Sequence, residues 1–79
     1  MKNTVKYFAL FREQTGIASE KVEWPGGNSQ DLFLLLSEKH TALMSESAAL
    51  VAVNDEMSDW HTTLEEGDEV LFFPPVAGG

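Results

Sequence analysis

The sequence predicts an α+β domain in which a mixed sheet of four to five strands packs on one main helix. Several short segments alternate apolar with polar residues, and a single longer stretch has helical spacing. Seventy-nine residues are enough for one hydrophobic core and too few for two. The chain has no cysteine, which excludes disulfides and thiolate metal sites, so this core must hold the fold by itself.

Two strands are predicted at the start of the chain. Apolar residues recur at every second position from Val5 to Phe11 and predict a strand over residues 4–11. The polar connection that follows has room for one helical turn at residues 12–14. A second alternating segment predicts a strand over residues 20–24, which pairs most simply antiparallel to the first.

The main helix is predicted over residues 29–40. Asn28 or Ser29 is a good N-cap, and Asp31 adds a negative charge to the first turn, where the helix dipole favours it. Four apolar residues fall on one side at helical spacing and are expected to face the sheet: Leu32, Phe33, Leu35 and Leu36.

Three further strands are predicted after the helix. Residues 41–49 are mostly small and polar and favour a loop, whereas residues 50–53 are continuously apolar, as in a strand covered on both faces. Residues 57–60 suggest a short edge strand, and Leu64 is expected to fill a bend. After a turn at Gly67, the last strand is predicted over residues 69–73. The order β-β-α-β-β-β fits a ubiquitin-like roll.

The charge balance argues against nucleic acid and membrane partners. Thirteen acidic and five basic residues give a formal charge of −8, which repels phosphates and anionic lipids. A basic protein partner would complement this charge, although acidity also simply favours solubility. No apolar run is long enough to span a bilayer, and residues 1–11 lack the features of a cleaved signal. We therefore expect an intact cytoplasmic protein.

Conventional catalytic and metal-binding patterns are absent from the sequence. His40 is expected at a helix C-terminus and His61 in a loop, and their spacing matches no metal motif. Gly26 and Gly27 lack the lysine and hydroxyl residues of a phosphate-binding loop. The densest acidic cluster is explained by solvated turns, or attracts a basic partner: Glu65, Glu66, Asp68 and Glu69. We expect no metal and no cofactor to bind this chain alone.

The last six residues are predicted to form an extended tail on a domain of residues 1–73. Pro74 and Pro75 cannot continue the strand, and residues 74–79 in an extended conformation would reach about 18 Å. Gly78 and Gly79 could pass through a channel too narrow for side chains, although mobility alone also explains terminal glycines. The carboxylate of Gly79 is then the best candidate reactive group. Because it is ionised and inert at neutral pH, it needs activation by a partner, for which ATP is the obvious reagent.

The sheet face away from the helix is predicted to be a docking surface. A single helix covers only one face, and alternation turns several large apolar side chains to the other. The expected members are Phe8, Leu10, Leu71 and Phe73, with Met57 as a further candidate. Apolar patches on the open face of a small domain usually mark an interface, although loops could cover part of this one.

The carboxyl end resembles a known family. The string from Phe72 to Gly79, Phe-Phe-Pro-Pro-Val-Ala-Gly-Gly, follows Glu-Gly-Asp-Glu-Val at residues 66–70. Together with Tyr-Phe-Ala at residues 7–9, Arg-Glu at 12–13 and Val-Ala-Val-Asn at 51–54, it resembles the small subunit of molybdopterin synthase, in the MoaD-like sulfur-carrier family. This resemblance implies a ubiquitin-like β-grasp fold. It also implies that an adenylating enzyme related to those activating ubiquitin uses ATP to activate Gly79, which then becomes a thiocarboxylate.

The resemblance also implies partners and residue roles. The chain would dock on the large catalytic subunit, which holds the main active site, in a heterotetramer, and give sulfur to cyclic pyranopterin monophosphate in molybdenum cofactor biosynthesis. The tail residues thread into that site: Pro74, Pro75, Val76, Ala77 and Gly78. The residues expected to bind the partner are Phe8, Arg12, Met57, Leu71 and Phe73. The alternatives are a sulfur carrier for thiazole synthesis or protein modification, and a ubiquitin-like binding module without chemistry.

Overall fold

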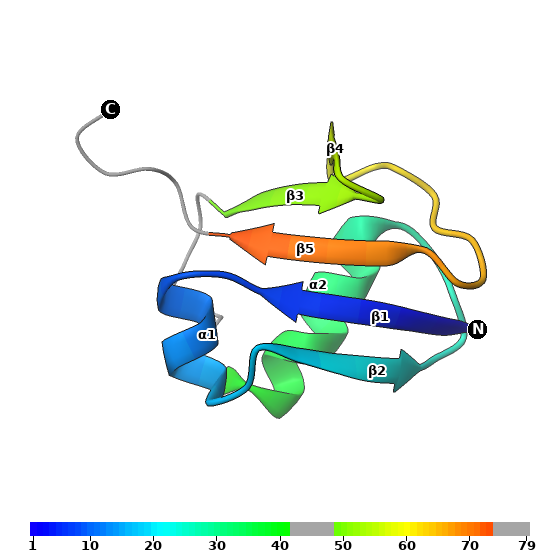
Figure 1. The fold of residues 1–79 in the computed structure, drawn as a ribbon. Helices are drawn as coiled ribbons and strands as arrows, with labels where there is room; N and C mark the ends of the chain where they lie inside the picture. The colour runs from blue at the N-terminus through cyan, green and yellow to red at the C-terminus, as the bar shows by residue number, and fades with distance from the viewer. Residues whose placement is uncertain (42–48, 74–79) are drawn as a thin grey trace.

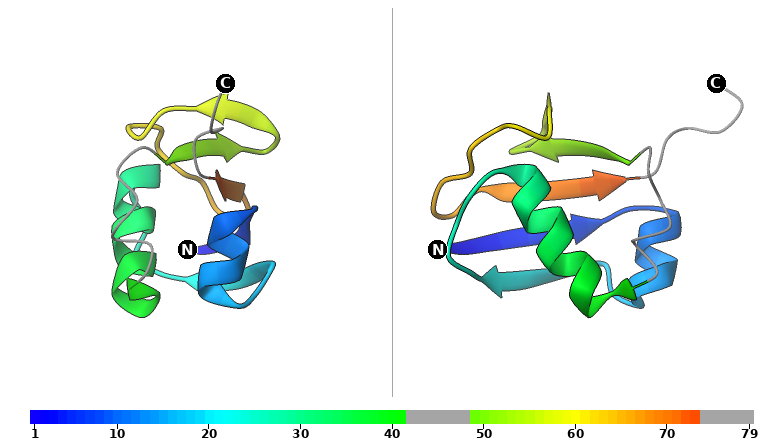
Figure 2. Two further views of the ribbon diagram at one scale, coloured as in Figure 1. Left: turned by 90° about the vertical axis from the view of Figure 1, so that its left-hand side faces the viewer. Right: turned by 180° about the vertical axis from the view of Figure 1, so that it is seen from behind.

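The computed structural model describes residues 1–41 and 49–73, which form a twisted sheet with two helices (Figure 1). The elements in chain order are β1 (Lys2–Tyr7), α1 (Leu10–Thr15), β2 (Ser19–Glu23), α2 (Ser29–Lys39), β3 (Leu50–Val53), β4 (Glu56–Ser58) and β5 (Glu69–Phe73). Helix α2 lies across one face of the sheet, and α1 sits at the end where β1 finishes (Figures 1 and 2). We call the sheet face opposite α2 the open face.

The sheet is mixed, with the strand order β2-β1-β5-β3-β4. The first and last strands, β1 and β5, run parallel in the middle, and the other three pairs are antiparallel. This arrangement confirms the predicted α+β roll of a mixed sheet on one main helix. Because β1 and β5 are parallel, their carboxyl ends meet at the same end of the sheet.

Helix α2 begins with a capping box and buries one side against the sheet. The Asn28 side chain accepts a hydrogen bond from the Asp31 N–H (2.8 Å), and the Asp31 carboxylate accepts one from the Asn28 N–H (3.0 Å). The predicted core residues Leu32 and Leu36 are buried, but Leu35 is 37% exposed, so its predicted place in the core is wrong. It lies on the flank of the buried stripe and borders β2 instead.

A buried asparagine joins the amino-terminal strand to the last turn. Asn3 is 1% exposed, and its Oδ1 accepts a hydrogen bond from Nε1 of Trp24 (2.7 Å). Its Nδ2 donates to the carbonyl oxygens of Glu65 (2.9 Å) and Asp68 (3.1 Å). These bonds satisfy the amide inside the core, as a buried polar group requires. They also fix the turn before β5 against β1.

The first strand is shorter than predicted. It ends at Tyr7, and Ala9 has φ 53° and ψ −122°, a conformation that breaks the strand and precedes α1. Phe11, predicted to lie on the strand, is fully buried from α1 instead. The alternation of apolar residues runs past the end of β1 to Phe11, because α1 also packs against the end of the sheet and buries an apolar residue there. The alternation alone therefore made the predicted strand too long. The predicted helical turn at residues 12–14 lies within α1.

The remaining helices and strands agree with the sequence within a few residues, while the loop predicted over residues 41–49 lies mostly outside the described residues. The antiparallel second strand, the helix, the strand at residues 50–53 and the last strand are confirmed, and Gly67 forms the predicted turn with φ 85°. The edge strand starts one residue earlier and stops at Ser58, so Trp60 lies in the following loop, where its ring stacks on Phe72 at 5.9 Å. Within residues 1–41 and 49–73, neither helix has the length and apolarity needed to cross a bilayer.

Candidate functional site

Three strands bring their ends together where β5 finishes. Tyr7 is paired with Phe72 across β1 and β5, and the Phe8 N–H donates to the carbonyl oxygen of Phe72 (3.2 Å). On the other side of β5, Leu50 is paired with Phe73. Phe8, Phe73 and Leu50 therefore form one row of neighbouring positions at the end of the sheet, directly before residue 74.

A second apolar row lies one step further into the open face. Leu71 is paired with Ala52, and Ala52 is paired with Met57 on β4. Side chains two residues apart on a strand share a face, so Leu71 lies on the same face as Phe73 and Ala52 on the same face as Leu50. The two rows form what we call the open-face patch: Phe8, Leu50, Met57, Leu71 and Phe73.

The open-face patch is exposed enough to bind another protein. Phe8 is 60% exposed, Met57 64% and Leu50 38%, while Leu71 and Phe73 are half-buried. Large apolar side chains seldom gather in this way on a surface without a partner. Sequence reasoning missed Leu50, because residues 50–53 resembled a strand covered on both faces. Because residues 50–53 are all apolar, no signal in the sequence separates the exposed Leu50 from the buried Val51.

Leu10 does not belong to this surface in the way predicted. It is the first residue of α1, so strand alternation does not place it, although it is 44% exposed. Arg12 also lies on α1 and is exposed. A groove of about 600 Å³ passes between the end of β1 and α1, and Phe8, Ala9, Arg12 and Ile17 help to line it. The structure thus brings Arg12 beside Phe8 at the edge of the open-face patch.

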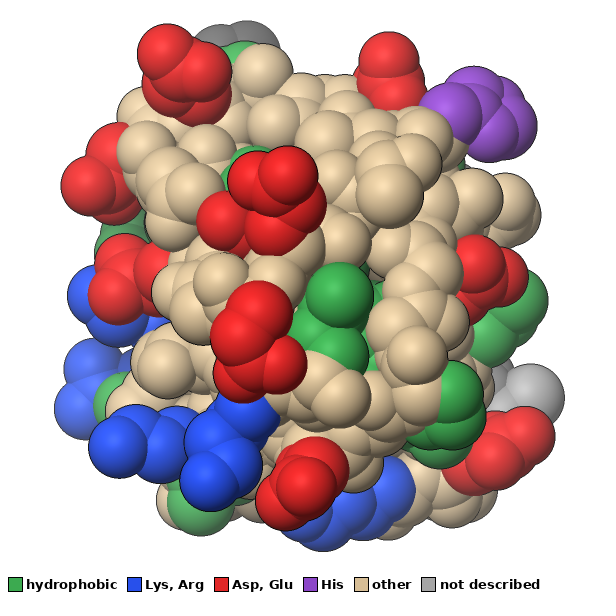
Figure 3. Space-filling view, turned by 90° about the vertical axis from the view of Figure 1, so that its right-hand side faces the viewer, with side chains coloured by type: hydrophobic (Ala, Val, Ile, Leu, Met, Phe, Trp, Pro, Cys, Tyr) green, Lys and Arg blue, Asp and Glu red, His purple; other side chains and the backbone are tan. Residues whose placement is uncertain are grey.

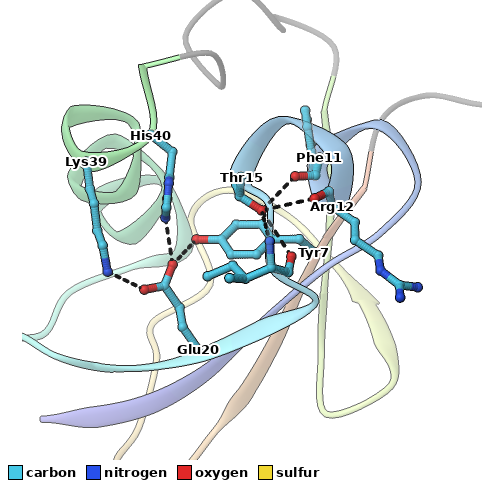
Figure 4. A network of polar contacts seen from close by, with 8 residues as sticks. Tyr7, Phe11, Arg12, Thr15, Glu20, Lys39 and His40 are labelled. Atoms are coloured by element: carbon cyan, nitrogen blue, oxygen red, sulfur yellow. Dashed lines mark hydrogen bonds and ion pairs between the residues drawn. The ribbon is translucent and has the colours of Figure 1, made fainter.

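A polar cluster on the other side of the sheet ties α2 to β1 and β2 (Figure 4). The Glu20 carboxylate accepts hydrogen bonds from the Tyr7 hydroxyl (2.6 Å) and from Lys39 Nζ (2.5 Å), and lies 2.9 Å from His40 Nε2. Burial acts to raise the pKa of Glu20, but the bonds from Lys39, Tyr7 and His40 outweigh it and hold that pKa below its usual value. Burial, with the bond and charge of Glu20, raises the pKa of Tyr7.

This cluster is structural. His40 is the C-cap of α2, as predicted for a helix end, and its ring meets Glu20 and the edge of Tyr7. His61 lies in the loop after β4, as predicted. No group of three metal-binding side chains occurs within the described ranges. Each polar atom around Glu20 has a partner, and the cluster stabilises the packing of α2 on the sheet.

The acidic cluster before β5 has local partners. Glu66 accepts from the Lys2 N–H (3.0 Å), and Asp68 accepts from the Glu65 N–H (2.8 Å). Oε1 of Glu69 forms an ion pair with Nζ of Lys6 (3.0 Å). These contacts favour the interpretation of residues 65–68 as a turn, in which the carboxylates of Glu66 and Asp68 bind within the domain, whereas Glu69 is the first residue of β5.

The predicted tail residues lie outside the described residues: Pro74, Pro75, Val76, Ala77, Gly78 and Gly79. What the structure places is the start of that segment. Phe73 is the last residue of β5 and lies between the end of β1 and the start of β3. It is next to Phe8, an exposed residue in the connection from β1 to α1. A segment continuing from Phe73 begins within the open-face patch.

The fold and this surface agree with comparisons to known proteins. Residues 5–79 match the ThiS family. The chain belongs to this family. It is 35% identical over 78 residues to the molybdopterin synthase sulfur carrier subunit of Escherichia coli (strain K12), and this match covers 95% of this chain and 96% of that protein. It is also 35% identical over 83 residues to the corresponding subunit of Chlamydomonas reinhardtii, over the whole of both chains.

Solved structures show the same β-grasp fold for this ThiS-family chain. A Pyrococcus furiosus protein described as molybdopterin converting factor subunit 1 has a TM-score of 0.87 at 34% identity, over 96% of this chain and 99% of that one. Small archaeal modifier protein 1 of Haloferax volcanii has a TM-score of 0.84 at 27% identity, over 95% and 98%. Subunit 1 in a Helicobacter pylori complex of molybdopterin-converting factor subunits 1 and 2 has a TM-score of 0.71 at 26% identity, over the whole of both chains.

Proposed function

We propose that this ThiS-family chain is the sulfur-carrier subunit of molybdopterin synthase. The observation that carries the proposal is its match, over nearly the full length, to molybdopterin synthase sulfur carrier subunits from a bacterium and an alga. The open-face patch supports it, because a carrier needs a docking surface beside the segment that it presents. Here that surface surrounds the end of β5.

The proposed reactive group is the carboxylate of Gly79. ATP on an adenylating enzyme converts it to an acyl-adenylate and releases pyrophosphate. A sulfur donor then attacks the carbonyl carbon, AMP leaves, and a thiocarboxylate results. In the large subunit, this sulfur forms a bond to a carbon of cyclic pyranopterin monophosphate and displaces an oxygen leaving group there. Water then hydrolyses the bond between the sulfur and the Gly79 carbonyl carbon, which leaves the sulfur on the pterin and restores the carboxylate. Holding the thiocarboxylate on a short arm raises its effective concentration at the acceptor, which is a proximity effect.

The open-face patch would serve both partners. The large catalytic subunit and the ubiquitin-activating-like enzyme must each receive the same tail, so each must approach the end of β5. Phe8, Met57 and Phe73 supply the apolar contacts, and Arg12 lies near Phe8 to pair with a carboxylate of the partner. One molybdopterin-converting factor subunit 1 of this fold is known in complex with its subunit 2, which supports such a pairing. A cytoplasmic heterotetramer of two small and two large subunits would follow.

A related carrier role is the second candidate. Small archaeal modifier protein 1 shares the fold over almost the whole chain, which favours transfer of Gly79 to lysines of other proteins as an alternative. Sulfur delivery to thiazole synthesis is a third use of the same chemistry. All of these begin with adenylation of Gly79. They differ in the group transferred, because a sulfur carrier passes on the sulfur of its thiocarboxylate, whereas a modifier joins its Gly79 carbonyl carbon to a lysine amine.

The test is the intact mass of the chain after incubation with its adenylating enzyme, ATP and a sulfur donor. We expect one oxygen to be replaced by sulfur, and the charged protein to convert cyclic pyranopterin monophosphate when the large subunit is added. A variant with one residue appended after Gly79 should fold normally and fail to gain sulfur. An unchanged mass under conditions that charge a control carrier would contradict the proposal, and adducts on lysines without pterin conversion would favour the modifier.

A further inference from the structure

The β2 edge of the sheet presents unpaired backbone groups. Met1 and Trp24 exchange two hydrogen bonds, at 2.7 and 2.9 Å, and the Tyr7 N–H donates to the carbonyl oxygen of Ala18 (2.9 Å). In an antiparallel pair, such inward-bonding positions alternate with outward ones. The backbone groups of Ser19, Lys21 and Glu23 therefore point away from β1. Within residues 1–41 and 49–73, β2 pairs with β1 alone.

The exposed side chains along this edge include one basic and one acidic residue, Lys21 and Glu23. Ser19, Lys21 and Glu23 are exposed and share the open face, where Lys2 is opposite Glu23 and Thr4 is opposite Lys21. In Figure 3 the basic side chains lie toward the lower part of the molecule, the height at which β2 lies in Figure 1, together with some acidic side chains, whereas the upper part shows acidic side chains and no lysine or arginine. The basic side chains near this edge reduce the repulsion expected there between two copies that each carry a charge of −8.

We propose that the β2 edge binds the β2 edge of a second copy of this chain, in antiparallel pairing about a two-fold axis at Val22. In this register Lys21 is opposite Glu23 of the second copy, and Glu23 is opposite its Lys21. Residues 21 and 23 both direct their backbone groups outward, so each such pair exchanges two hydrogen bonds. The two-fold axis repeats every contact, which is the self-complementarity that an isologous interface needs.

The charge pattern selects this register over its neighbour. An axis at Lys21 would place two lysines directly opposite each other, which is unfavourable. Within one copy, Lys2 on β1 is already opposite Glu23 on β2. The axis at Val22 places Lys21 of the second copy on the other side of Glu23, so charges of alternating sign follow one another across three successive strands. On the other face, the half-buried Val22 meets its own copy beside Leu35, which is 37% exposed. Val22 and Leu35 line a groove of about 450 Å³ between β2 and α2. In the proposed pair, both of these apolar residues would contact the second copy.

The other edge of the sheet is a poorer site for such pairing. Strand β4 has three residues, against five in β2, and it carries Met57 of the open-face patch. Pairing through β2 leaves the end of β5 accessible, because β1 lies between β2 and β5. Most of the open-face patch is on β5, β3 and β4, and Phe8 follows the carboxyl end of β1. The proposed self-association is therefore compatible with partner docking and does not depend on the proposed function.

Charge exchange across the axis tests the register. Sedimentation equilibrium of the wild type should show mass above that of the monomer as the concentration approaches about 1 mM, the range expected for a few hydrogen bonds and ion pairs. Lys21→Glu and Glu23→Lys each place like charges opposite one another, so each should need at least about tenfold higher concentration to associate. The double variant Lys21→Glu/Glu23→Lys, and an equimolar mixture of the two single variants, should associate like the wild type.

The control is Glu56→Lys, which makes the same charge change as Glu23→Lys on the opposite edge. It should associate at least as well as the wild type. A wild type that stays monomeric at about 1 mM overturns the proposal and leaves this edge to an extended segment of another protein. Single variants that associate as the wild type does would overturn it equally. Circular dichroism of each variant excludes unfolding as the cause.

Discussion

Removing the Phe8 side chain should weaken docking far more than folding. Phe8 is 60% exposed and lies at the end of β1, beside Phe73. A phenylalanine exposes about 200 Å² when fully accessible, so about 120 Å² remains for a partner to cover. At about 25 cal/mol per Å², covering it contributes about 3 kcal/mol. Phe8→Ala should therefore cost about 2 to 3 kcal/mol of docking free energy, or roughly 30- to 150-fold in Kd.

The assay is isothermal titration of the carrier with the large subunit of molybdopterin synthase and, separately, with the adenylating enzyme. Leu34→Ala is the matched control, because Leu34 is 58% exposed but lies on α2, which covers the other face of the sheet. It removes a similarly exposed apolar side chain and should leave both Kd values unchanged. The urea midpoint of each variant checks that both remain folded.

The result that would refute the reasoning is a Kd for Phe8→Ala within twofold of the wild type for both partners. The open-face patch would then not be the docking surface. Equal losses for Phe8→Ala and Leu34→Ala would also contradict it, because the effect would then not be specific to the open face.

Phe73→Asp should weaken docking by at least about 1 kcal/mol, since it places an unpaired charge in the same contact.

Three further predictions concern stability and are measured by urea unfolding. Asn3→Leu should lower the free energy of unfolding by about 3 kcal/mol, because the Trp24 N–H and two carbonyl groups lose their buried partner; a loss below about 0.5 kcal/mol would show that water replaces it. Ala9→Gly should raise it by about 1 kcal/mol by relieving the strain of a positive φ, and a decrease would mean that Ala9 is not strained. Glu20→Gln should lower the free energy of unfolding at neutral pH. The pKa of Glu20 is lowered in the folded state, so the stability contributed by its charge is present above the unfolded-state pKa and is lost as the pH falls through the folded-state pKa. A difference in free energy of unfolding between wild type and variant that persists in acid would contradict this origin.

Local chemistry in the sequence was sufficient for most of the elements. The box of Asn28 and Asp31 starts α2, Gly67 forms the turn before β5, and the alternation around Val22 marks β2. Each of these depends on residues a few positions apart. The resemblance at the carboxyl end, from Phe72 to Gly79, pointed to the family from a short contiguous string of residues. Composition alone limited the chain to one small core without disulfides or metal thiolates.

Contacts between distant segments decided the rest. The sequence could not show that Ala9 breaks the first strand, because the apolar pattern runs unbroken to Phe11 and is satisfied equally by a strand or by a docked helix. Nor could it show the three bonds of the buried Asn3, whose partners lie 21 to 65 residues away. Polar residues of this kind are usually expected at the surface.

The surface that we propose for docking combines both kinds of information. The sequence determined that Phe8, Leu71 and Phe73 would face away from the helix, because side chains alternate along a strand. Only the parallel pairing of β1 with β5 placed Phe8 beside Phe73, and only the pairing of β3 with β5 added Leu50. Strand order and register are set by how the whole core packs, since a strand buries its apolar face equally well beside several neighbours. The tertiary structure therefore decided where these residues meet, and the sequence decided which residues were free to meet there.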